Sequence, residues 1–121
     1  LTVGMRHNDS LVTASQVWVA DNYAVPNPVA EMAAQSGLTE RSFLRRFKRA
    51  TGQSPIQYVQ TLRIEEAKQI IETSDAPLDD VAAQVGYTEP SAFRRMFMRL
   101  VGVSPAAYRR RFAKPQLASG E

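Results

Sequence analysis

Basic side chains concentrate in residues 37–52, GLTERSFLRRFKRATG, where Glu40 is the only acid. The cations are Arg41, Arg45, Arg46, Lys48 and Arg49. Phe43 and Phe47 lie four residues apart in the same stretch, which is a helical apolar spacing. A basic surface raises the local concentration of polyanions, and nucleic acid is the usual candidate. The chemistry that these residue types favour is therefore non-covalent anion binding.

The charge along the chain is uneven, although the formal net charge is only +3. Residues 41–64 and 90–120 contain cations and no acid. The carboxylates between them are Glu65, Glu66, Glu72, Asp75, Asp79 and Asp80. Two basic segments that flank an acidic one favour polyanion binding, and the alternative is that each basic helix face is solvated surface.

The segment 32–58 is repeated at 81–108. The first copy contains, in order, Ala33, Ala34, Gln35, Gly37, Thr39, Phe43, Arg45, Phe47, Arg49, Gly52, Ser54, Pro55 and Tyr58. The same residue types recur in order at Ala82, Ala83, Gln84, Gly86, Thr88, Phe93, Arg95, Phe97, Arg99, Gly102, Ser104, Pro105 and Tyr108, with one extra residue after Thr88. Chance similarity between two amphipathic helices would not reproduce the glycine, Ser-Pro and tyrosine positions, so the repeat indicates two similar supersecondary units.

Turn and cap residues predict helices throughout. Gly37 and Gly52 suit helix C-termini, and Pro28 suits a first helical position. No stretch alternates with period two, so no sheet is expected. The predicted helices span residues 12–23, 28–36, 40–51, 55–73, 78–85, 89–101 and 105–112. The expected fold class is all-α, with two helix-turn-helix subdomains, a long linker helix and about seven helices in total.

These helices predict five segments along the chain. Residues 1–11 are expected to be a disordered N-terminal extension, and residues 114–121 a C-terminal tail. The first subdomain is predicted at 12–54, the linker helix at 55–74 and the second subdomain at 75–113. The chain begins with Leu1 and not Met, so we expect a fragment of a longer protein.

Each unit has the residue order that a helix-turn-helix requires: a small residue, a turn glycine and a core hydrophobe. In the first unit these residues are Ala33, Gly37, Leu38 and Phe43, and in the second they are Ala82, Gly86, Tyr87 and Phe93. The buried side of the first predicted helix is expected to consist of Val12, Val17, Val19, Ala20 and Tyr23. Trp18 is expected to pack nearby. Along the linker helix the expected apolar positions are Ile56, Val59, Leu62, Ile64, Ala67, Ile70 and Ile71.

A helical wheel separates two sides on each candidate recognition helix. In the first unit it places Phe43, Phe47 and Ala50 on the buried side, and Arg41, Ser42, Arg45, Lys48 and Arg49 away from it. In the second it buries Phe93, Met96, Phe97 and Leu100, turns Ser91, Arg95, Met98 and Arg99 outward, and places Arg94 on the flank. Such a helix fits the major groove, where arginine can bond a guanine edge while neighbouring cations meet phosphates. The helix N-termini at Thr39, Ser54, Thr88 and Ser104 are predicted phosphate contacts.

Other function classes have weaker support. The sole histidine is His7 and the chain has no cysteine, so we expect no catalytic residue, no metal site, no cofactor and no enzyme. No apolar run reaches about 18 residues, so no membrane partner is expected and a cytoplasmic location fits. The alternative function is a helical interaction module that contacts the transcription machinery through Glu65, Glu66 and Glu72.

The repeat closely resembles the AraC/XylS family of bacterial transcriptional regulators. The resemblance rests on GLTERSFLRRFKRATGQSPIQY, LRIEEAKQII and VAAQVGYTEPSAFRRMFMRLVGVSPAAYRRRF, and covers about residues 12–112. The stretch RRFKRATGQSP, with LRIEEAKQIIETSDAPLDDVAAQVGY, also resembles the subgroup whose upstream domain is like a class I glutamine amidotransferase of the ThiJ/PfpI type. The resemblance implies a seven-helix domain that binds double-stranded promoter or operator DNA, with an effector or dimerisation domain upstream and RNA polymerase as a further candidate partner.

The resemblance also implies roles for single residues. Base or backbone contacts fall on Arg41, Ser42, Leu44 and Arg45 in the first unit, and on Ser91, Arg94 and Arg95 in the second. Arg46 and Arg49 match positions that contact phosphate or pack, and the predicted DNA-binding set also includes Lys48 and Arg99. Pro90 departs from the family pattern, because many relatives have a polar residue there that can reach a base.

Overall fold

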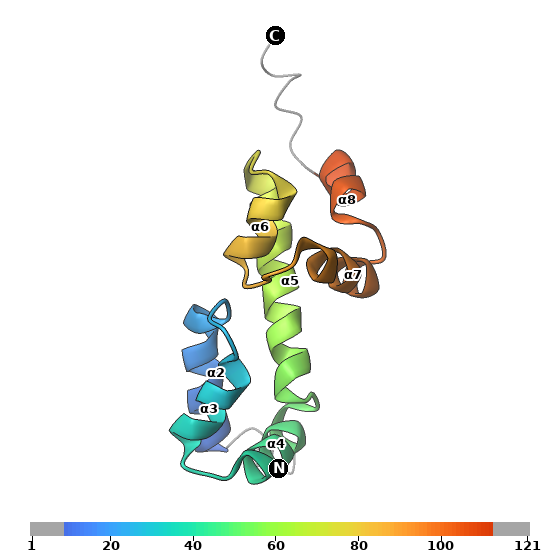
Figure 1. Ribbon diagram of the computed structural model, residues 1–121. Coiled ribbons are helices and arrows are strands. Elements are labelled where there is room, and N and C mark those ends of the chain that lie inside the picture. The colour runs from blue at the N-terminus through green and yellow to red at the C-terminus, as the bar shows by residue number, and fades with distance from the viewer. Residues whose placement is uncertain (1–8, 113–121) are drawn as a thin grey trace. The chain divides into compact units, whose positions relative to one another are not determined.

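A computed structural model describes residues 9–112 of the chain, and every regular element in that range is an α-helix (Figure 1). The helices are α2 (Ser10–Asn22), α3 (Pro28–Ser36), α4 (Glu40–Thr51), α5 (Pro55–Thr73), α6 (Leu78–Gln84), α7 (Pro90–Val101) and α8 (Pro105–Phe112). The prediction of an all-α fold with two helix-turn-helix units is confirmed. Within residues 9–112, no helix is long and apolar enough to cross a membrane. Residues 1–8 and 113–121, which include His7 and most of the predicted terminal segments, lie outside the described range.

The chain divides into two compact units, with the boundary between Leu62 and Arg63 inside α5. In the first unit, α2 packs against α3 and α4, and the core is built from α2, α3, α4 and the start of α5. Phe43 and Phe47 are fully buried there, and the Phe47 ring meets Tyr58 edge-on with the ring centres 5.3 Å apart. Trp18 packs against the same core, as predicted. The two phenylalanines thus fix the inner side of α4.

The second unit repeats this packing with the corresponding residues. Phe93 and Phe97 are buried, and Phe97 meets Tyr108 edge-on at 5.5 Å between ring centres. Tyr87 packs against Phe93 at 5.6 Å. Ile64, Ala67 and Ile71 of α5 and Val81, Ala82 and Val85 near α6 are also buried. The aromatic residues that correspond in the repeat therefore bury the inner side of α7 as they bury that of α4.

The turn between α3 and α4 depends on two residues that the sequence analysis identified. Gly37 adopts φ 76° and ends α3, where its N–H donates to the Ala34 carbonyl at 3.2 Å. Thr39 is the N-cap of α4, and its hydroxyl accepts the Ser42 N–H at 3.1 Å. A residue with an L side chain is strained at that φ, so the tight connection between α3 and α4 depends on Gly37.

Two helix starts differ from the prediction. Helix α2 begins at Ser10 and not at Val12, because the Asp9 carboxylate caps it by accepting the N–H groups of Leu11 and Val12. Ser10 and Leu11 therefore belong to a helix and not to an extension. Helix α7 begins at Pro90 and not one residue earlier, because a residue before proline is disfavoured in the helical region. The residue before it, Glu89, is extended, with φ −123° and ψ 121°.

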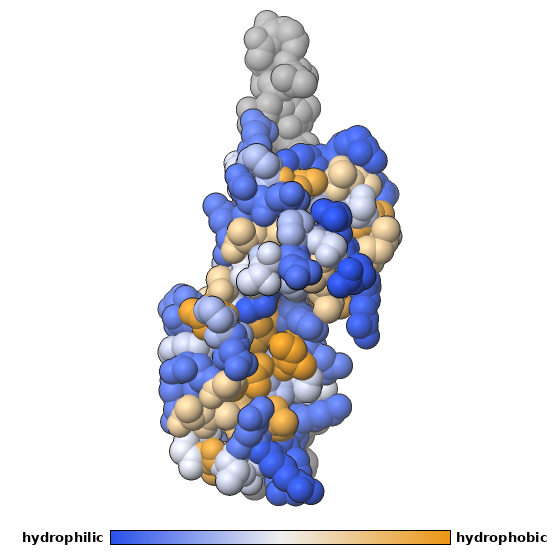
Figure 2. All heavy atoms as spheres, in the orientation of Figure 1, coloured by the Kyte–Doolittle hydropathy of each residue, from blue (hydrophilic) through white to orange (hydrophobic). Residues whose placement is uncertain are grey.

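Four residues that were predicted to be buried are exposed. A helical wheel shows which residues share a side of a helix, but it does not show whether another helix covers that side. Val17 and Ala20 of α2 are exposed, and so are Ile56 of α5 and Leu100 of α7. Val17 is 67% exposed, whereas Val12 and Val19 of the same helix are buried. The buried residues of α2 are Val12, Ser15 and Val19. Figure 2 shows that the surface seen from this side is mostly hydrophilic, with smaller apolar areas between.

Candidate nucleic-acid interface

Helix α4 presents its cations to solvent. Phe43, Phe47 and Ala50 are buried, which confirms the predicted inner side. Four of the five cations are exposed, namely Arg41, Arg45, Lys48 and Arg49, and Ser42 is half-buried. These four cations lie on the solvent side of α4, while Phe43 and Phe47 hold its opposite side in the core.

A hollow of about 450 Å³ lies beside this basic side. Its lining comes from Leu44, Arg45, Lys48 and Arg49 of α4 and from Ser54, which precedes α5. Four predicted site residues on α4 and one predicted helix-terminus contact are thus brought together in one place. Leu44 is 38% exposed there, which gives the hollow an apolar wall among cations.

Helix α7 presents the corresponding surface of the second unit. Phe93 and Phe97 are buried, whereas Arg94, Arg95 and Arg99 are exposed. Ser91 is half-buried. Arg94 lies 3.7 Å from the Asp79 carboxylate at the start of α6, with both side chains more than half exposed. An exposed pair of this kind contributes little to stability, so Arg94 remains able to exchange this partner for another anion.

The apolar content of the outer side of α7 is higher than the wheel predicted. Met98 is 49% exposed and Leu100 is 46% exposed, although Leu100 was expected to be buried. Met96, expected on the same inner side, is half-buried. Met98 occupies the position that Lys48 has in the first unit. The two surfaces share the matched arginines Arg45/Arg95 and Arg49/Arg99, whereas Arg41 corresponds to Ser91 and Leu44 corresponds to Arg94.

Of the four predicted helix-terminus contacts, three are helix caps in the structure and one is not. Thr39 and Ser54 cap α4 and α5, since their hydroxyl groups accept the N–H groups of Ser42 and Gln57. Ser104 caps α8 by accepting the Ala107 N–H at 3.1 Å. Thr88 is not a cap, because Pro90 shifts the start of α7 and makes Glu89 the N-cap.

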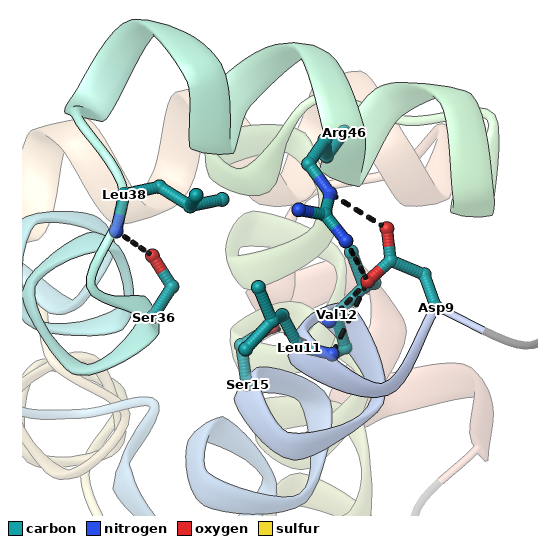
Figure 3. A network of polar contacts seen from close by, with 7 residues as sticks. All are labelled: Asp9, Leu11, Val12, Ser15, Ser36, Leu38 and Arg46. Atoms are coloured by element: carbon teal, nitrogen blue, oxygen red, sulfur yellow. Dashed lines mark hydrogen bonds and ion pairs between the residues drawn. The ribbon is translucent and has the colours of Figure 1, made fainter.

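Arg46 differs from its neighbours on α4. Its side chain is 41% exposed, and its guanidinium group makes two contacts with the Asp9 carboxylate, each at 3.0 Å (Figure 3). The hydrogen bond from Arg46 is the largest cause that lowers the pKa of Asp9. Asp9 was missed by the sequence analysis, although an aspartate directly before an apolar-periodic run is a typical N-cap signal.

Within residues 9–112, no group of three or more histidine, aspartate or glutamate side chains is placed to hold a metal ion. The arrangement offers cationic and hydroxyl groups on two exposed helices. Its chemistry is therefore hydrogen bonding and charge pairing with an anionic partner.

Comparison with known proteins places this arrangement in a family. Residues 32–111 match the family described as "Helix-turn-helix domain". The MmsAB operon regulatory protein of Pseudomonas aeruginosa is 40% identical over 80 residues, which are 66% of this chain and 26% of that protein. A putative AraC-like transcription regulator of Streptomyces antibioticus is 31% identical over 102 residues, which are 84% of this chain and 34% of that protein.

A solved structure agrees with these sequence relatives. The DNA-binding domain of AdpA, a global transcriptional factor crystallised with a target DNA, is 37% identical and has a TM-score of 0.77. The match covers 81% of this chain and 88% of that domain. The chain spans about a quarter to a third of the length of the curated relatives it matches. By its matched residues and its two helix-turn-helix units, the chain belongs to the AraC-type family of helix-turn-helix domains.

Proposed function

We propose that this chain is the sequence-specific, double-stranded DNA-binding part of a bacterial transcriptional regulator. The observation that carries the proposal is the pair of exposed arginine surfaces on α4 and α7, each mounted on a helix-turn-helix unit. The AdpA domain supports it, because that relative was crystallised with a target DNA and is 37% identical to this chain.

In the proposed mode, α4 and α7 each enter a major groove, and the two grooves are successive along the duplex. Arg45 and Arg95 occupy matched positions and are both exposed, so each is proposed to donate two hydrogen bonds to a guanine edge. Leu44 is proposed to contact a thymine methyl group, which is the usual apolar feature of that groove. Helix α5 contains 19 residues, and at about 1.5 Å per residue it is about 28 Å long.

Phosphate contacts are proposed around these readers. Arg41, Lys48, Arg49 and Arg99 are exposed beside them, and cations in such positions fix register without reading sequence. The N-terminus of α8 is a better phosphate donor than that of α5. The Ser54 N–H already donates to the Gln57 side chain at 3.0 Å, whereas the corresponding residue Ala107 has no side-chain acceptor to offer Ser104.

The activity of the whole regulator goes beyond this chain, which covers only part of its relatives. We propose that further domains sense an effector or dimerise the protein, and that RNA polymerase is contacted once the domain is bound at a promoter. The ThiJ/PfpI-type subgroup remains a prediction of the sequence.

The test is selection of duplexes from a random pool with the purified chain, followed by titration with salt. We expect a recurring sequence to be enriched, and its affinity to fall by orders of magnitude between about 50 and 200 mM salt. A helical module that binds only protein would enrich no sequence and would show no dependence on duplex. That result would reject the proposed function.

A further inference from the structure

The carboxylate of Asp9 joins two helices at once. Its oxygens accept the N–H groups of Leu11 at 3.2 Å and Val12 at 3.3 Å, which caps α2. The same oxygens accept Nε and a terminal nitrogen of Arg46 from α4, both at 3.0 Å (Figure 3). Paired contacts between a guanidinium and a carboxylate are directional and charge-assisted, so they hold orientation as well as distance. We call this four-bond arrangement the Asp9–Arg46 clamp.

The clamp acts on the rotation of α4 about its own axis. Phe43 and Phe47 bury the inner side of the helix, and Arg46 ties its flank to the start of α2. Arg45, the proposed reader, is the residue directly before Arg46. The Asp9 side chain is 18% exposed and the Arg46 side chain is 41% exposed, so water reaches the ion pair mainly from the Arg46 side. A rotation of α4 that moved Arg45 would have to break the clamp.

The second unit shows that the fold does not require the clamp. The residue that corresponds to Arg46 is Met96, which is half-buried in α7 and carries no charge. Helix α7 nevertheless keeps the same aromatic packing, with Phe93 and Phe97 at 5.7 Å between ring centres, as in Phe43 and Phe47. A methionine at this position is therefore compatible with a helix-turn-helix unit, and the clamp is an addition specific to the first one.

We infer that Asp9 is a positioning residue for DNA reading, and that Arg46 serves the clamp and not a phosphate. The inference rests on the proposed function, because positioning has a meaning only if α4 reads DNA. It changes the role predicted for Arg46, which the sequence grouped with the DNA contacts. It also ties the start of the described chain to the reading helix, so that a disturbance at Asp9 would reach α4 directly.

Two variants separate positioning from direct contact. Asp9→Ser keeps an N-cap residue for α2 but removes the ion pair, because serine and aspartate cap about equally well. Arg46→Met installs the residue of the second unit and leaves the cap intact. Affinity is measured for the selected duplex and for a scrambled duplex of the same length, at a temperature well below the melting point of each variant.

We expect each variant to weaken binding to the selected duplex about tenfold, within the usual range of coupling between contacting residues, and to change binding to the scrambled duplex less than about twofold. The double variant should be no weaker than either single variant. The salt dependence of binding should stay as in the parent chain, since no phosphate contact is lost.

Three results would overturn the inference. If Asp9→Ser bound like the parent chain, the clamp would not position α4. If Arg46→Met weakened both duplexes alike and lowered the salt slope by about one, Arg46 would be a phosphate ligand. If the parent chain itself selected no duplex, the proposed function would fail first, and the inference with it. Should Asp9→Ser not fold, Arg46→Met decides the question alone, because its cap is unchanged.

Discussion

The hydroxyl of Tyr108 in α8 donates a hydrogen bond to the carboxylate of Glu72 near the end of α5. The Tyr108 ring also packs edge-on against Phe97, which anchors α7. Because Phe97 lies on the inner side of the helix that carries Arg95 and Arg99, this bond supports the proposed reading surface of the second unit from behind. The residues involved all lie between Arg63 and Phe112.

A matched pair of tyrosine variants tests this support. The Tyr87 hydroxyl is buried and has no hydrogen-bond partner among the described residues, whereas the Tyr108 hydroxyl has one. Tyr108→Phe should lower the free energy of unfolding by about 1–2 kcal/mol, because the Glu72 carboxylate loses its donor. Tyr87→Phe should be neutral or slightly stabilising, because a buried unsatisfied oxygen is removed. Urea denaturation of both variants measures the difference, and equal losses would contradict the assignment.

Alkaline pH should weaken the same contact. Burial and the bond to Glu72 raise the pKa of Tyr108 from 10.0 to about 12. A raised pKa means that the stability which the neutral tyrosine provides is complete below about pH 10 and is lost as the pH rises toward 12. The stability difference between the parent chain and Tyr108→Phe should therefore shrink over this interval. A difference that stays constant up to pH 12 would show that the hydroxyl does not titrate in this environment.

Acid should open the Asp9–Arg46 clamp. The hydrogen bond from Arg46 lowers the pKa of Asp9 below its usual 3.8, and desolvation opposes this effect more weakly. A lowered pKa means that the stabilisation is present above pH 3.8 and is lost as the pH falls through the lower folded value. The stability advantage of the parent chain over Arg46→Met should thus be constant near neutrality and disappear only in strong acid. An advantage lost already between pH 5 and 7 would be inconsistent with this pair.

The turn in the first unit gives a prediction that involves no charge. Gly37 has φ 76°, and a Cβ added there would meet no atom within 4 Å. Gly37→Ala should still cost about 1–2 kcal/mol, because an L-residue pays a backbone penalty in the left-handed region. Thermal unfolding measures this loss. Gly37→Asn is the control and should cost less, since asparagine tolerates that region better.

Much of the fold could be predicted because the repeat encodes it locally. Gly37, Thr39, Ser54 and Pro55 mark helix ends by their own backbone preferences, and Phe43 and Phe47 give the buried side by spacing alone. Exposure of Val17, Ile56 and Leu100 could not be predicted in this way. A wheel describes one helix, and the cover over each side depends on neighbouring helices.

For the candidate site, too, local features could be predicted from the sequence and long-range contacts could not. The outward direction of Arg45 and Arg95 follows from their spacing to the phenylalanines, and the structure places both on exposed sides. The partner of Arg46 could not be predicted, because Asp9 is 37 residues away in sequence and only the packing of α2 on α4 brings them together. Long-range pairs of this kind leave no periodic pattern in the sequence.

The central claim is that the exposed arginines of α4 and α7 read duplex DNA, and a mobility-shift assay on the selected duplex tests it most directly. Arg45→Ala and Arg95→Ala should each lose about 1–3 kcal/mol of binding free energy and accept other bases at one position. Arg49→Ala should weaken all duplexes similarly. Lys68→Ala removes a cation that pairs with Glu65 on α5 and should leave affinity unchanged. Unchanged affinity in both Arg45→Ala and Arg95→Ala would contradict the account.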